Sequence, residues 1–251
     1  MPLATTAKPK RPTRILAIQH DAADPPGAVS EVARELGCPM EVLRMDRGDA
    51  IPAQSDADVL MSFGGGISLT DPDFVRPEWV ETEQSLMRWF VQSGRKVLGI
   101  CQGAQVLALS LGAEVRRNRG PEVGWHPVRR VGRQTGAASV LPDQFTALHW
   151  HRDTFDLPHG ATRLFASDAT ENQGFAVGDR VFGFQFHLEA TPRTIEIFLA
   201  VSPLCRSPSL FVQSEQQITE GAAVHLPTQR AWLVQFLAHF LSDQDKPSAP
   251  K

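Results

Sequence analysis

The chain has 251 residues, which is near the upper end of what one hydrophobic core serves, and 42% of them are hydrophobic. Its 25 Lys and Arg residues nearly balance 28 Asp and Glu residues, for a formal net charge of −3. This balance gives no electrostatic reason to expect nucleic acid or an anionic membrane as a partner, so a small molecule or another protein is expected.

The two ends of the chain are predicted to be tails. Residues 1–12 are rich in Lys, Pro and Thr, and residues 242–251 are polar with two prolines. Such compositions bury little apolar surface. We therefore expect a disordered tail over 1–12, a single folded domain over 13–241 and a flexible tail over 242–251. Because neither a signal-peptide pattern nor a membrane-spanning apolar run occurs, we expect a cytoplasmic location.

The first half of the chain alternates short apolar runs with segments of helical spacing. Strands are predicted within 14–20, 41–45, 58–63 and 96–100, and helices over 29–36, which Gly37 ends, and over 77–92. Buried strands that alternate with helices are typical of a parallel sheet covered on both faces.

From about residue 113 the pattern changes to short runs broken by Gly, Pro and Asp. The runs 124–128, 176–181 and 182–186 predict antiparallel hairpins added to the same sheet. Closing helices are expected over 191–201 and 229–241, whereas 202–227 has no clear pattern. The predicted fold class is α/β, with three layers, a mostly parallel central sheet, helices on both faces and an antiparallel extension.

Cys101 follows the predicted strand 96–100 and precedes a predicted helix over 104–111. Glycines at 99 and 103 would permit a tight, strained turn, and a helix amino terminus stabilises a thiolate. The pattern indicates an activated nucleophile. The alternative is a small apolar residue buried where strand meets helix.

The other two cysteines, Cys38 and Cys205, lack comparable surroundings and are predicted to be structural. Three widely scattered cysteines match neither a zinc motif nor a disulfide framework.

His187 and Glu189 lie two residues apart in 182–189, whose alternating pattern predicts an extended strand. Their side chains would then emerge on one face, where a carboxylate can orient an imidazole acting as a general base. The alternative is a solvated His and Glu pair at a strand end. His149 and His151 also have ligand-like spacing, but no further ligands stand nearby in sequence, so neither a metal nor a cofactor is predicted.

Four blocks of the chain resemble the class I glutamine amidotransferases, especially stand-alone proteins similar to the glutaminase domain of GMP synthase. They are SFGGGISLTD (62–71), GICQGAQ (99–105), HWHRDTFDLP (149–158) and GFQFHLEATP (183–192), in the expected order. The resemblance covers roughly residues 14–192. It implies a flavodoxin-like amidotransferase fold.

The resemblance also implies a mechanism. Cys101 would attack the carboxamide carbon of glutamine, His187 would pass the proton to departing ammonia, and Glu189 would orient His187. Water would then release glutamate from the γ-glutamyl thioester. The backbone N–H groups of Gly65 and Gln102 match the positions that form the oxyanion hole.

Substrate contacts follow from the same resemblance. Gln105 matches a position that contacts bound glutamine, and Trp150, His151 and Arg152 match a loop whose backbone holds the polar end of the amino acid. Gly64 belongs to the glycine loop that must approach the substrate closely. The alternatives are a surface position for Gln105, a core position for Trp150 and an ordinary tight turn for the glycines.

Two positions depart from the family pattern. Ala104 stands where the family often has His, and Gly66 stands where Pro is common. Neither change removes a predicted catalytic group, although both affect the expected shape of the pocket.

Three functions remain open on the sequence. A glutaminase subunit would pass ammonia to a separate synthetase, since the chain contains no Gly-x-x-x-x-Gly-Lys-Ser/Thr motif of its own. A γ-glutamyl peptidase or hydrolase would use the same triad without a synthetase. A noncatalytic binding or regulatory protein would retain only the fold. A serine hydrolase is not favoured, because no Gly-x-Ser-x-Gly motif occurs.

Overall fold

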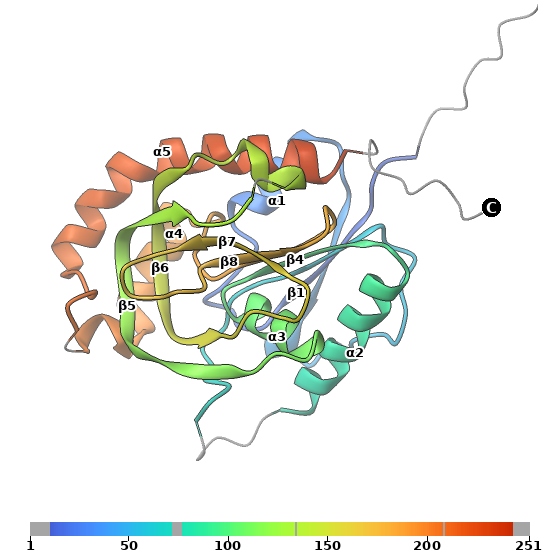
Figure 1. The fold of residues 1–251 in the computed structure, drawn as a ribbon, viewed down its shortest axis with the longest axis horizontal. Helices are drawn as coiled ribbons and strands as arrows, with labels where there is room; N and C mark the ends of the chain where they lie inside the picture. Colours follow the sequence, from blue (N-terminus) through green and yellow to red (C-terminus); the bar gives the residue numbers. More distant parts are fainter. Residues whose placement is uncertain (1–10, 72–76, 134, 208, 243–251) are drawn as a thin grey trace, which may run out of the picture.

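The computed structural model describes residues 11–71, 77–133, 135–207 and 209–242 (Figure 1). Its parallel strands are β1 (Ile15–Gln19), β2 (Met40–Arg44), β3 (Val59–Ser62), β4 (Lys96–Ile100) and β9 (Val181–Phe184). Its remaining strands are β5 (Val115–Arg130), β6 (Gln144–Phe155), β7 (Thr162–Ala166) and β8 (Gly174–Val177).

All these strands join one sheet in the order β2-β1-β3-β4-β9-β8-β7-β5-β6. The pairs from β2 to β9 are parallel, and the pairs from β9 to β6 are antiparallel. The predicted fold class, a parallel sheet with an antiparallel extension, is therefore confirmed.

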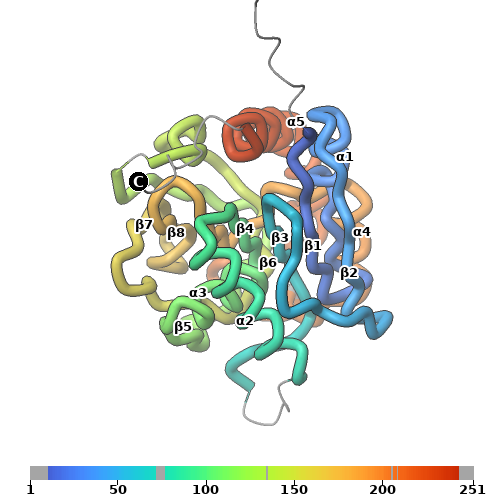
Figure 2. The backbone as a smooth tube through the Cα atoms, turned by 90° about the vertical axis from the view of Figure 1, so that its right-hand side faces the viewer, coloured from blue at the N-terminus to red at the C-terminus, as the bar shows by residue number. Residues whose placement is uncertain are grey.

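Helices cover both faces of the parallel half. The helices are α1 (Ala28–Glu35), α2 (Glu78–Gln92), α3 (Gln102–Ser110), α4 (Pro192–Val201) and α5 (Glu215–Phe240). Figure 2 shows the strands between α1 and α5 on one side and α2 and α3 on the other. Every residue of β1, β3 and β4 is buried, because apolar side chains point to both faces and both are covered.

Two separate apolar clusters fill these layers. Val29 and Phe236 belong to the cluster beneath α1 and α5, whereas Phe90 and Leu107 belong to the cluster beneath α2 and α3. A third cluster lies beneath α4 and the start of α5 and includes Trp150 and Phe198. This third cluster supports one wall of the site described below.

The antiparallel half is longer than predicted. The run 124–128 is only part of β5, and β6 was not predicted as a strand at all. Residues 150–152, which the resemblance placed in a loop, lie on β6. The strand escaped recognition because polar side chains such as His149 and Asp153 are buried along it, which removes the usual apolar alternation.

The last helix begins well before residue 229. Ser214 caps it by accepting a hydrogen bond from the Gln217 N–H, while the Gln217 side chain accepts one from the Ser214 N–H. Pro227 lies inside this helix and interrupts the pattern that would have predicted its first half.

Most of both predicted tails, residues 1–10 and 243–251, lies outside the described residues, so the domain limits stay a prediction. Arg11, within the expected tail, donates two hydrogen bonds to the Asp58 carboxylate. Within the described ranges, no helix combines the length and apolar character needed to cross a bilayer.

Candidate active site

Cys101 occupies the turn between β4 and α3. Its φ is 52° and its ψ is −113°, and within the described ranges it is the sole non-glycine residue with a positive φ. Such a conformation is strained for a residue with a Cβ, and it persists only where the surroundings fix it. Here the Cys101 N–H donates to the Phe184 carbonyl at 2.8 Å. The sharp turn that the sequence predicted at Cys101 is confirmed.

Glycines 99 and 103 are required by close packing around this turn. A Cβ on Gly99 would lie 2.6 Å from the Gly103 carbonyl oxygen, and a Cβ on Gly103 would lie 2.2 Å from the Ser62 carbonyl oxygen. The first turn of α3 therefore packs directly on the ends of β3 and β4. This agrees with the prediction that the turn needs glycine at 99 and 103.

His187 and Glu189 come together, although not on one strand. β9 ends at Phe184, His187 forms a single bridge to Leu148, and Glu189 lies in a turn. The predicted strand over 182–189 is therefore wrong in its second half. The His187 Nδ1–H nevertheless donates to Glu189 Oε1 at 2.6 Å, with both side chains buried.

The thiol of Cys101 and the imidazole of His187 are electrostatically coupled. Burial raises the pKa of the Cys101 thiol, while the charge of His187 opposes that rise. Burial also acts to lower the pKa of His187, but the Glu189 carboxylate and the thiol outweigh it, so the pKa of His187 is raised well above its usual value. The Cys101 Sγ also lies 4.0 Å from the Trp150 carbonyl oxygen.

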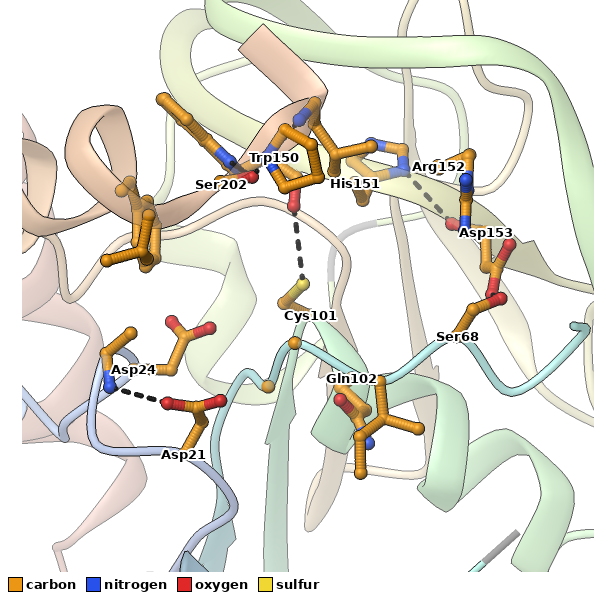
Figure 3. Close-up of a pocket in the computed structure, with 18 of the residues that line it drawn as sticks. Asp21, Asp24, Ser68, Cys101, Gln102, Trp150, His151, Arg152, Asp153 and Ser202 are labelled. Carbon is orange, nitrogen blue, oxygen red and sulfur yellow. Dashed lines mark hydrogen bonds between the residues drawn. The ribbon is translucent and has the colours of Figure 1, made fainter. Parts of the chain in front are cut away.

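A cavity of about 660 Å³ opens over Cys101 (Figure 3). Among the residues predicted to form the site, those that line it are Gly65, Cys101, Gln102, Gln105, Trp150, His151 and Arg152. His187 and Glu189 lie behind this surface, and Gly64 does not line it. The opposite walls come from the loop after β1, the glycine loop after β3, and α4 with the following residues.

The glycine loop approaches the start of α3 closely. A Cβ on Gly65 would lie 2.4 Å from the Gln102 side-chain oxygen. Within the described part of the chain, no acceptor is found for the backbone N–H of Gly65 or of Gln102. The two N–H groups that the resemblance assigned to an oxyanion hole therefore belong to segments in close contact, and neither donates to an acceptor in the described residues.

Gln105 and Trp150 are both more enclosed than a surface position allows. The Gln105 side-chain N–H donates to the Asp153 carbonyl and to the Gln185 side-chain oxygen, each at 3.2 Å. The Trp150 indole N–H donates to the Ser202 hydroxyl at 2.8 Å, and its ring packs on Phe198. The surface alternative for Gln105 is wrong, whereas Trp150 belongs both to the core and to the cavity wall.

Two residues that sequence reasoning missed lie beside Cys101. The Gln185 side-chain N–H contacts the Cys101 Sγ at 3.7 Å. Asp24 is almost fully buried, with its Oδ1 4.0 Å from His187 Nδ1, and burial raises the pKa of its carboxyl to about 6. A signal for Asp24 existed, since it follows the carboxyl end of the first parallel strand, where α/β folds place ligand sites.

Ligand-type side chains also gather next to the cavity. Glu122, His149 and His151 are buried and offer ligand atoms that all lie within 4.8 Å of one another. The sequence revealed the two histidines but not Glu122, which arrives opposite His151 through the pairing of β5 with β6. Of the two residues predicted to be structural, Cys38 is buried, and the side chain of Cys205 lies outside the described part.

The fold is that of solved glutamine amidotransferases. The class I glutamine amidotransferase family model matches residues 27–199, and the chain belongs to this family. The glutamine amidotransferase-like protein YfeJ of Salmonella typhimurium is 31% identical over 190 residues, which cover 73% of this chain and 78% of YfeJ.

Other relatives match shorter segments. One of them, a component of the glutamine-hydrolysing GMP synthase of Sulfolobus acidocaldarius, is 35% identical, over 43% of this chain and 60% of that protein. Gamma-glutamyl peptidase 5 of Arabidopsis thaliana is 30% identical, over 62% of this chain and 63% of that protein. A solved glutamine amidotransferase of Methylobacillus flagellatus superposes with a TM-score of 0.85 and 27% identity, covering 96% of this chain and 99% of that one.

Proposed function

We propose that this protein hydrolyses the side-chain amide of glutamine with Cys101 as the nucleophile, His187 as the acid and base, and Glu189 as its orienting carboxylate. The observation that carries the proposal is the strained turn that presents the Cys101 thiol to the cavity, in electrostatic contact with a histidine that Glu189 holds at 2.6 Å.

The coupling of the two side chains sets the path of the proton. The charge of His187 lowers the pKa of the Cys101 thiol against the effect of burial, and the Glu189 carboxylate and the thiol raise the pKa of His187, so His187 holds the thiol proton while sulfur attacks the carboxamide carbon. His187 returns that proton to the departing amine, which releases ammonia and leaves a γ-glutamyl thioester. Water attacks the thioester, His187 takes the water proton and returns it to sulfur, and glutamate leaves.

The negative charge on the tetrahedral intermediate requires donors fixed in advance. The N–H groups of Gly65 and Gln102 are suited to this role, since both residues line the cavity with Cys101 and neither N–H donates to a protein acceptor in the described ranges. The His20 Nδ1 lies 3.2 Å from the Gly64 carbonyl oxygen. Because the C=O and N–H of one trans peptide point in opposite directions, a bond there also fixes the direction of the Gly65 N–H.

The remaining parts of the proposal concern substrate and partners. Gln105 and the backbone of residues 150–152 would hold the amino-acid end of the substrate, and Gly64, which does not line the cavity, would contribute by placing the Gly65 N–H. Ammonia would pass to a separate synthetase, in a cytoplasmic setting, with no cofactor needed for the hydrolysis itself. Residues 13–241 would form the single functional domain.

The decisive experiment measures ammonia and glutamate release from glutamine by the wild-type protein and by Cys101→Ala, His187→Ala and Glu189→Ala. We expect Cys101→Ala to abolish turnover and His187→Ala to reduce it nearly as much. Glu189→Ala should reduce turnover less, because the Glu189 carboxylate orients His187 and transfers no proton. Mass spectrometry of protein treated with an electrophilic glutamine analogue should find the adduct on Cys101. Full activity of Cys101→Ala would discard the mechanism.

A second candidate is a γ-glutamyl peptidase, and two observations favour it. The cavity of about 660 Å³ is of a size that holds ligands well beyond a single amino acid, and a plant γ-glutamyl peptidase is among the relatives. Comparing kcat/KM for glutamine and for γ-glutamyl dipeptides separates the two. Turnover of dipeptides alone selects the peptidase, and absence of any covalent adduct on Cys101 selects a noncatalytic protein.

A further inference from the structure

A buried group of three polar side chains lies beside the catalytic cavity and has no part in the proposed hydrolysis. Glu122 on β5 and His149 and His151 on β6 have exposed fractions of 0%, 0% and 3%. His149 and His151 are two residues apart on one strand and therefore point to the same face, while Glu122 pairs directly with His151 across the hairpin.

Several atoms of this group face one another without hydrogen-bond partners. Within the described part of the chain, Glu122 Oε1, both ring nitrogens of His149 and His151 Nε2 are buried and unpaired. A fully buried polar atom left unpaired costs about 1–3 kcal/mol, so four in one place require an explanation. A cation held between the three side chains would bond to Glu122 Oε1, His151 Nε2 and one nitrogen of His149, and so would satisfy three of the four atoms.

The separations between the facing atoms suit a small metal ion. Glu122 Oε2 lies 3.2 Å from His151 Nε2, and Glu122 Oε1 lies 3.7 Å from His149 Nδ1. Ligand atoms around a tetrahedral zinc ion, with bonds of about 2.0–2.1 Å, stand about 3.3 Å apart. The two pairs made by Glu122 are near that spacing, and since one ligand atom from each of the three residues lies within 4.8 Å of the others, side-chain adjustments would close the set on one ion.

The outer contacts are also those of metal ligands. The other ring nitrogen of His151, Nδ1, lies 3.1 Å from the Asp153 carbonyl oxygen, as Figure 3 shows. Ligating histidines almost always donate their second N–H to such an acceptor, which leaves Nε2 free for the ion. Glu122 Oε2 accepts hydrogen bonds from the Thr170 hydroxyl and the Gln173 side chain, which fix the carboxylate.

We propose that Glu122, His149 and His151 bind a divalent transition-metal ion of the zinc class beside the cavity. Two imidazoles and one carboxylate leave a fourth position for water, and His151 lines the cavity, which gives the ion a route of entry. This site is separate from Cys101, His187 and Glu189, and it departs from the sequence expectation of no metal.

The competing occupant is a proton on His151 Nε2, which would pair with Glu122 as a buried ion pair. That pairing would leave both ring nitrogens of His149 without a hydrogen-bond partner. A metal ion would bond to one of them as well as to His151 and Glu122. The two occupants are distinguished by metal binding.

The test uses full-length protein carrying Cys101→Ala, so that the catalytic thiol cannot bind zinc. After chelator treatment, the protein is titrated with zinc against a competing chelator, and bound metal is measured by mass spectrometry. We expect one zinc per chain, loss of binding in His149→Ala/His151→Ala, and binding at least tenfold weaker in Glu122→Gln. The exposed residue His239 provides the control, since His239→Ala should bind as tightly as its parent.

Two results would overturn the proposal: no zinc bound at micromolar free metal, or full binding by the double histidine variant. If that variant does not fold, X-ray absorption of the zinc-loaded Cys101→Ala protein decides. Two imidazoles with an oxygen ligand support the site, and a sulfur ligand or fewer than two imidazoles reject it. Because Cys101 is absent throughout, the outcome is independent of glutamine hydrolysis.

Discussion

At the scale of single residues, the site carries a charge that weakens the fold. Asp24 has no side-chain hydrogen bond in the described part of the chain, and its carboxyl packs against Gly64, so that the charge of His187, 4.0 Å away, only partly offsets the cost of burial. Burial raises its pKa from 3.8 to about 6. Between these values the folded protein binds more protons than the unfolded chain, so the stability of the fold declines as pH rises from about 4 to about 6.

Asp24→Asn should therefore stabilise the protein at neutral pH. The pKa difference of about 2 units corresponds to at most about 3 kcal/mol in the free energy of unfolding above pH 7. At pH 4 most of the gain should be lost, and well below pH 4 it should vanish because Asp24 is then protonated in both states. Urea unfolding at pH 4 and pH 8 measures both values.

The exposed carboxylate of Asp168 is the control for this prediction, with its side chain 64% accessible. Asp168→Asn should change the free energy of unfolding by no more than about 0.5 kcal/mol at either pH. An Asp24→Asn protein as stable as wild type at pH 8 would contradict the buried-charge argument.

At the scale of elements, the contact of α3 with β3 sets the position of Cys101. Gly103→Ala places a methyl group 2.2 Å from the backbone oxygen of Ser62, which cannot rotate away. We expect a loss of about 3 kcal/mol in stability, as for overpacked cores, together with reduced turnover as Cys101 shifts. Gly120→Ala meets only the Ser209 hydroxyl at 3.2 Å and should have little effect. Equal stability of the two variants would reject this account.

A second link between elements connects α2 to the glycine loop through His20. His20 Nε2 lies 2.8 Å from the Glu83 carboxylate, and the His20 ring stacks on Trp79. The Glu83 carboxylate accepts a further hydrogen bond from the Ser62 hydroxyl. The Glu83 carboxylate more than offsets the effect of burial and raises the pKa of His20, so the ring can donate at both nitrogens. α2 therefore holds the Gly64 carbonyl in place through one buried imidazole.

His20→Ala should lower kcat for glutamine about tenfold with little change in KM, because the Gly65 N–H loses its fixed direction. Steady-state kinetics of folded variant protein measures the two constants separately. Glu83→Gln, which keeps a hydrogen-bond acceptor for His20, should lose less activity than His20→Ala. A rise in KM alone would assign His20 to substrate binding instead.

At the scale of the whole molecule, phenylalanine rings connect the sheet to α5. Phe236 lies 5.6 Å from Phe182 and 5.3 Å from Phe184, measured between ring centroids, and it is fully buried. Phe184 also accepts the hydrogen bond from the Cys101 N–H through its carbonyl. The packing of α5 thus reaches β9, the strand whose end binds the Cys101 N–H.

Phe236→Ala should lower the free energy of unfolding by about 3–5 kcal/mol, the usual cost of removing a buried aromatic ring. Urea denaturation followed by circular dichroism measures it. Leu210→Ala is the matched control, because Leu210 is 97% exposed and should cost no more than about 0.5 kcal/mol. A loss for Phe236→Ala as small as that for Leu210→Ala would contradict the packing of α5 into the core.

The sequence by itself determined the parallel half of the sheet, its helices and the turn at Cys101, because each is encoded in a contiguous run of residues. Periodicity, the glycines around Cys101 and the His187 and Glu189 spacing are all local signals. The four motif blocks supplied the family in the same way.

Only the tertiary structure decided which distant residues share a site. Asp24, Gln185 and Glu122 reach the cavity or its border through loop packing and strand pairing, which no local pattern encodes. β6 escaped prediction because polar residues such as His149, His151 and Asp153 are buried along it, so the apolar alternation of an ordinary strand is missing.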